Sequence, residues 1–196
     1  MQTIINLSQK KAGICMRNNY STFIEQIAEY SLWANEKLSR HLEKVSNKKF
    51  TQDIGSKFVN DTNCPTSSLR SIAEHCMIGL EYGRHIIECL AWNEYDTIQS
   101  YRLLTKEQLL DRWVRHYIEF KQLFLDNIGK TVKFNEEEIY LGREFFFTFF
   151  NHFIYHLGQF MIALKMVGED TVDLDYMTFL KEIGSKYFVR NLSTQS

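Results

Sequence analysis

The chain has 196 residues, a mass of 23.3 kDa and a formal net charge of −1, from 23 basic and 24 acidic residues. This size suits one domain with a sizeable core, and the balanced charge argues against nucleic acid or an anionic membrane surface as a partner. The chain has one proline and nine glycines. These residues form the tight turns between strands, so their small number favours a mainly helical fold.

The cysteines indicate neither a zinc knuckle nor a disulfide scaffold, because no two of them form a C-x-x-C pair. They are Cys15, Cys64, Cys76 and Cys89. Reduced thiols in a cytoplasmic protein are the simplest interpretation. Residues 1–19 lack the apolar h-region of a secretory signal, so we expect a loose leader there, with Met16 as an alternative start.

Helical periodicity begins at Tyr20, and apolar residues recur on one face up to Lys44. Residues 45–65 lose this period and predict a loop with at most one short turn of helix. The hydroxyl groups of residues 66–68 can cap a second helix, which is expected to run to about Trp92.

Residues 93–104 predict an irregular crossing, and Thr105 then starts a third helix that ends before Gly129. A short polar connection over residues 131–138 leads to the fourth helix, which is expected from Leu141 to Gly168.

A short terminal helix within residues 173–187 precedes a polar tail at 188–196. Together these elements predict an all-α fold: a four-helix bundle with long inter-helix connections and a short C-terminal helix. The single domain is expected to occupy residues 20–187.

The most informative stretch is Phe145 to Gly168, FFFTFFNHFIYHLGQFMIALKMVG. His152 and His156 are four residues apart, so on a helix they share one face and can close on a common atom. A pair with this spacing arises by chance in roughly one such chain in six. A metal site therefore needs a third ligand.

The same stretch is apolar enough to raise the question of a membrane span, since residues 145–164 carry no charge. We reject a span because four polar side chains lie near its centre, where they are costly in hydrocarbon. They are Asn151, His152, His156 and Gln159. A helix buried in a bundle accounts for the same pattern.

His75, inside the predicted second helix, is the candidate third ligand. Three histidines with a free fourth position form the ligand set of a catalytic zinc-type site. Ordinary hydrogen-bonded histidines, or a polar seam in a purely structural bundle, remain alternatives. A di-iron site is disfavoured because no Glu-x-x-His occurs, and Phe153 replaces the glutamate of H-E-x-x-H proteases. No P-loop, G-x-G-x-x-G or G-x-S-x-G motif is present either.

Three segments resemble the DinB/YfiT-like superfamily of metal-binding four-helix bundles, over about residues 20–168. They are Tyr30-x-x-Trp33-Ala34-Asn35, Ser68-Leu69-x-x-Ile72-x-x-His75 and Asn151-His152-x-x-Tyr155-His156-x-Gly158-Gln159.

The resemblance implies that His75, His152 and His156 bind one divalent transition metal, with zinc or nickel as first choices, and leave positions for water or substrate. The family often has arginine directly after the last histidine, where this chain has Leu157. That departure spares the ligands but removes an expected anion contact.

Relatives include S-transferases and isomerases that use bacillithiol, mycothiol or glutathione. The resemblance therefore implies a metal that activates a thiol cosubstrate, or water, for attack on a small electrophile. The alternative is a non-catalytic metal-binding or stress-response protein. Relatives are often homodimers, and the dense phenylalanine cluster of residues 145–150 fits that expectation.

Five further residues are pocket candidates. Thr148 and Gln159 lie one helical turn from the histidine pair and Tyr82 two turns after His75, while the other two belong to the first resembling segment. The candidates are Tyr30, Asn35, Tyr82, Thr148 and Gln159.

Overall fold

The computed structural model describes residues 2–55, 67–90, 94–134 and 137–183. The expected tail at 188–196, and the end of the expected C-terminal helix, lie outside this part. The elements are α1 (Gln2–Lys44), α2 (Asn47–Phe50), α3 (Leu69–Glu88), α4 (Glu94–Arg102), α5 (Lys106–Asn127), β1 (Thr131–Lys133), β2 (Ile139–Leu141), α6 (Gly142–Met166) and α7 (Tyr176–Glu182).

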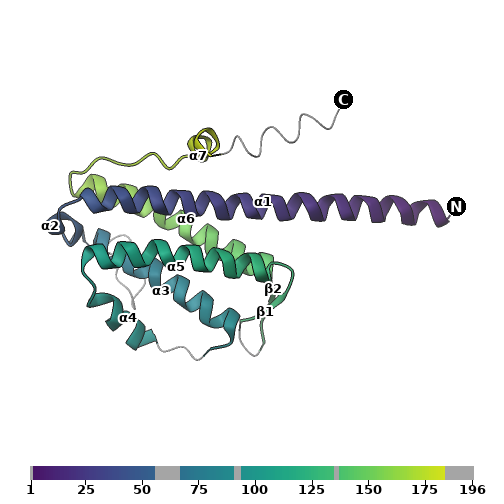
Figure 1. Cartoon of the computed structure of the whole chain (residues 1–196), viewed down its shortest axis with the longest axis horizontal. Coiled ribbons are helices and arrows are strands. Elements are labelled where there is room, and N and C mark those ends of the chain that lie inside the picture. The colour runs from purple at the N-terminus through teal and green to yellow at the C-terminus, as the bar shows by residue number, and fades with distance from the viewer. Residues whose placement is uncertain (1, 56–66, 91–93, 135–136, 184–196) are drawn as a thin grey trace.

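The long helices α1, α3, α5 and α6 pack into one bundle (Figure 1). Both α5 and α6 contact α1 and α3, so α1 and α3 occupy diagonally opposite corners. Helices α1 and α6 run in one direction and α3 and α5 in the other (Figure 1). Because α3 and α5 are parallel, α4 must carry the chain back along the bundle, which rules out simple up-down order. The predicted helical bundle is confirmed.

Local capping chemistry sets where the bundle helices begin. The Ser68 side chain accepts a hydrogen bond from the Ser71 backbone N–H, and the Ser71 hydroxyl accepts one from the Ser68 backbone N–H. Thr105 and Gln108 form the same kind of capping box at α5. Both predicted start signals are confirmed. Gly168 follows α6 with a φ of 72°, the left-handed conformation expected of a terminating glycine.

The core absorbs most of the dense phenylalanine cluster at the start of α6. Phe145, Phe146 and Phe150 are buried and Phe149 is half-buried against the core, whereas Phe147 is 45% exposed. The cluster thus leaves one ring for a partner, and the homodimer stays a prediction. No helix in the described part of the chain is long and apolar enough to cross a membrane.

Three predicted connections or boundaries are wrong. α1 begins at Gln2 rather than Tyr20, and residues 2–19 continue a helix that extends past the bundle (Figure 1). No proline interrupts this segment.

Two predicted connections contain regular structure. Residues 94–102, predicted as an irregular crossing, form helix α4. The connection after α5 contains an antiparallel hairpin that pairs Thr131 with Leu141 and Lys133 with Ile139. Strands of three residues are too short to give a readable alternation.

One buried charge joins the start of α5 to the end of α1. Lys106 is 8% exposed, and its Nζ donates to the carbonyl oxygens of Glu43 at 2.8 Å and Val45 at 2.7 Å. The last carbonyls of a helix lack intrahelical donors, so this ammonium group satisfies acceptors that burial would otherwise leave unpaired.

Replacing this ammonium group tests its contribution to stability. Lys106→Met keeps the length of the side chain but removes the donor, and we expect it to lower the free energy of unfolding by about 1.5–3 kcal/mol, as for hydrogen bonds to charged groups. Urea denaturation measures the change. Lys44→Met, which removes an exposed charge at the same helix end, should change stability by less than about 0.5 kcal/mol. Equal effects of the two substitutions would contradict the assignment.

Candidate metal centre

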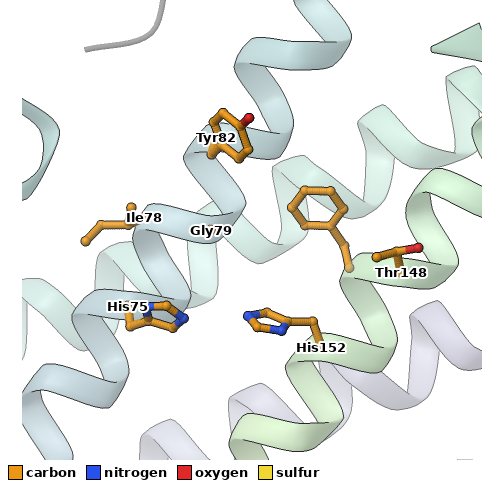
Figure 2. Close-up of a pocket in the computed structure, with 7 residues that line it drawn as sticks. His75, Ile78, Gly79, Tyr82, Thr148 and His152 are labelled. Carbon is orange, nitrogen blue, oxygen red and sulfur yellow. The ribbon is translucent and has the colours of Figure 1, made fainter. Parts of the chain in front are cut away.

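The three histidines singled out in the sequence converge between α3 and α6. His75 comes from α3 and His152 and His156 from α6, and one nitrogen from each lies within 4.8 Å of the others. Figure 2 shows the rings of His75 and His152 pointing toward each other across the gap between the two helices. The hypothesis of a purely structural polar seam predicted imidazoles that do not converge, and it is wrong on this point.

The spacing of these nitrogens fits a common metal ion. The Nε2 atoms of His152 and His156 are 2.9 Å apart, and the ring centroid of His75 lies 4.7 Å from that of His156. Two imidazole nitrogens that bind one tetrahedral ion at 2.0–2.1 Å stand about 3.3 Å apart. The His152–His156 pair therefore needs to open by only a few tenths of an ångström.

The burial of the three histidines decreases from the core outward. His156 is buried, His75 is half-buried and His152 is exposed. The Nδ1 of His156 donates to Gln159 Oε1 at 2.7 Å, and Gln159 Nε2 in turn donates to the Tyr155 hydroxyl at 3.1 Å. With its proton on Nδ1, His156 directs the lone pair of Nε2 toward the other histidines, as a metal ligand requires.

The protonation of His156 also suits a metal ligand. Burial, reinforced by the neighbouring His75 and His152 and partly opposed by the hydrogen bond to Gln159, lowers the pKa of His156 to about 4. The imidazole is therefore neutral at pH 7, and no proton has to be displaced before a cation binds.

A cavity of about 490 Å³ adjoins the cluster, a size typical of small-molecule sites. It is lined by His75, Ile78, Gly79, Tyr82, Thr148, Phe149 and His152. Two of the five pocket candidates, Tyr82 and Thr148, are among these residues. Sequence reasoning missed Ile78, Gly79 and Phe149, although each lies three or four residues from a ligand, a spacing that could have identified them.

The other three candidates lie outside the cavity lining given for the described residues. Gln159 accepts the hydrogen bond from His156 Nδ1. Asn35 is buried in α1 and donates to the carbonyl oxygen of Ser31 at 2.7 Å, and the Tyr30 hydroxyl donates to that of Leu174 at 2.7 Å. The physical reason is the topology, since α1 is diagonally opposite α3 and the cavity opens between α3 and α6.

The remaining described histidines take no part in the cluster. His41 Nε2 contacts the carbonyl oxygen of Asp170 at 2.7 Å, His85 Nδ1 contacts that of Glu81 at 3.0 Å, and His116 lies 3.4 Å from the Glu81 carboxylate. Each of these rings thus has a contact of its own outside the cluster.

A comparison with family models matches residues 16–185 to the DinB family. The match covers most of the chain and includes all three cluster histidines. No curated protein matches the sequence.

Acidification should destabilise the metal-free protein through His156. Below its ordinary pKa of 6.5 the unfolded imidazole binds a proton, whereas the folded one stays neutral down to about pH 4, so stability falls as the pH falls through this window. Urea unfolding in the presence of a chelator, at about pH 7 and pH 5, should show a smaller loss for His156→Gln than for the wild type. His85→Gln, the control, should keep the full loss; an unchanged loss in His156→Gln would count against a neutral buried imidazole.

Proposed function

Since the chain belongs to the DinB family, we propose that His75, His152 and His156 bind one divalent transition metal ion, and that the protein is an enzyme that activates a thiol cosubstrate, or water, for attack on a small electrophile. The observation that carries the proposal is the convergence of three imidazoles beside a cavity of ligand size.

The three histidines have different roles in holding the ion. His156, buried and oriented by Gln159, is a fixed neutral donor, while His75 and His152 form part of the cavity wall. Imidazole suits zinc and nickel, which are the ions we propose. When bound, such an ion lowers the pKa of a coordinating thiol or water and so supplies a nucleophile at neutral pH.

The cavity places a reaction partner next to the ligands. A molecule within it contacts His75 and His152 directly, so the nucleophile and the electrophile share one small space. At the position where relatives often have arginine, this chain has Leu157, which is uncharged and buried, so this position offers no positive charge to an anionic cosubstrate. This observation favours water or a weakly charged thiol over a cosubstrate recognised by its carboxylates.

Two further features of the proposal rest on the sequence. Cys76 and Cys89 form no disulfide in the described part of the chain, which fits a protein that works in the reducing cytoplasm. We also propose a homodimer, which size-exclusion chromatography with light scattering would test directly.

Loss of one ligand should abolish stoichiometric metal binding. Wild-type protein is expected to retain about one zinc or nickel ion per chain, and His152→Ala should bind it at least 100-fold more weakly, because removing a ligand costs more than the 10- to 100-fold typical of outer-sphere partners. Elemental analysis and competition with a chromophoric chelator measure this. His85→Ala is the matched control on α3. Wild-type protein that binds no transition metal would contradict the proposal.

The supporting amide should matter for affinity in a graded way. Gln159→Leu removes the acceptor for His156 Nδ1, and we expect metal affinity to fall about 10- to 100-fold without loss of the site. Gln122→Leu removes an exposed amide on α5 that donates to Asp126 at 3.1 Å, and it should leave affinity unchanged.

Turnover separates the enzyme from its alternative. Zinc- and nickel-loaded protein, supplied with glutathione, bacillithiol or mycothiol or with no thiol, should convert members of a panel of small electrophiles, and His152→Ala should lose that conversion. A protein that binds metal but shows no His152-dependent conversion across the panel would instead be a non-catalytic metal-binding or stress-response protein.

A further inference from the structure

Helix α3 carries two glycines in its interior, four residues apart, on the side that follows His75. Gly79 and Gly83 lie one and two turns after that ligand. Glycine destabilises a helix interior relative to alanine, and neither residue has the positive φ that would require glycine. Each therefore calls for a reason in its surroundings.

The reason for Gly83 is close packing. A Cβ atom at this position would lie 2.8 Å from Cε1 of Phe149 and 2.9 Å from Cε2 of Phe120, both far shorter than van der Waals contact. Gly83 thus lets the Phe149 ring rest directly against the backbone of α3. The ring is held from its other sides by Phe145, with centroids 4.9 Å apart, and by Phe120, at 5.4 Å.

Gly79 has no comparable neighbour. A Cβ atom there would meet no other atom within 4 Å, yet the residue is in the middle of α3 and lines the cavity beside the metal centre. Figure 2 shows it on α3 between His75 and Tyr82, with Thr148 and His152 on the facing helix. The open space over the Gly79 backbone is the cavity itself, so any side chain at this position would occupy it.

The chemistry of the walls indicates what can fill that space. Phe149, Tyr82 and Ile78 present two aromatic rings and one aliphatic side chain, and none of the described lining residues is Asp, Glu, Lys or Arg. A charged group placed against these three side chains would lose its hydration without gaining an ion-pair partner from them. A flat aromatic group gains contact with both rings and fits the close approach that a bare backbone allows.

We propose that Gly79 determines the specificity of this cavity: its missing side chain admits an uncharged aromatic group, which lies over the α3 backbone beside Phe149, with its reactive end toward His75 and His152. The orientation of the reactive end toward His75 and His152 rests on the proposed function. The aromatic preference rests on the cavity alone and can be tested without a metal.

Filling the space should remove aromatic binding while preserving the fold. Gly79→Leu projects an isobutyl group into the cavity, and Gly79→Ala a methyl group. Because both residues favour helix over glycine, their thermal unfolding temperatures should equal or exceed that of the wild type. Gly158 on α6 provides the matched control, since it also has no atom within 4 Å of its Cβ position but does not line the cavity.

The first arm uses metal-free protein and 2-naphthol as an uncharged aromatic probe, followed by NMR titration. Wild type and Gly158→Leu should bind it equally, Gly79→Ala several-fold more weakly, and Gly79→Leu at least tenfold more weakly. The naphthol should also perturb the amide signals of α3 near Gly79. Equal binding by Gly79→Leu and the wild type, or no binding by the wild type, would overturn the inference.

The second arm uses cobalt-loaded protein and compares imidazole with 4-phenylimidazole through the visible absorption of the metal. The wild type should prefer the phenyl derivative by about tenfold or more, and Gly79→Leu should lose this preference yet bind cobalt and imidazole as the wild type does. A preference that survives in Gly79→Leu would overturn the inference. Failure of wild-type protein to bind cobalt at all would contradict the proposed function instead. The aromatic preference would then be decided by the 2-naphthol titration of metal-free protein.

Discussion

The candidate site depends on the register between α3 and α6. One histidine comes from α3 and two from α6, so a slide of either helix by one turn would move the His75 nitrogen about 5.4 Å relative to the other two. This register is held by the contact between Gly83, two turns after His75, and Phe149, one turn before His152. The missing side chain of Gly83 leaves room on α3 for the Phe149 ring of α6. Packing of apolar groups thus places the polar ones.

A second determinant is the unequal burial of the three imidazoles. His156 is held neutral by its buried position and oriented by the Gln159 amide, whereas His152 is exposed and His75 intermediate. The result is a candidate site with one buried, oriented histidine and two histidines on the side of the cavity. Such a graded arrangement would hold an ion firmly while leaving part of its surroundings accessible.

The helix-one segment Tyr30-x-x-Trp33 has a different task from the one its position suggested. Tyr30 donates to the carbonyl of Leu174, and the indole nitrogen of Trp33 donates to Glu182 at 2.9 Å. The two rings pack against Phe179 of α7, each with centroids 5.7 Å apart. This segment fastens the C-terminal helix to α1, and its sequence pattern serves the architecture rather than the cavity.

The amino-acid sequence by itself determined the helical class, the capped starts of α3 and α5, and the three histidines, because these features depend on spacing within one helix or on chemistry at its ends. The positions of Thr148 and Gln159 within a turn of the histidine pair followed from the same periodicity. Only the tertiary structure decided that α3 and α5 run parallel. It also decided that α1 packs on α5 and α6, diagonally across from α3, which removes Tyr30 and Asn35 from the cavity. It also decided that Gly79 faces open space while Gly83 meets an aromatic ring. The two glycines look alike in sequence, and the difference arises because contacts between distant segments depend on how whole helices pack.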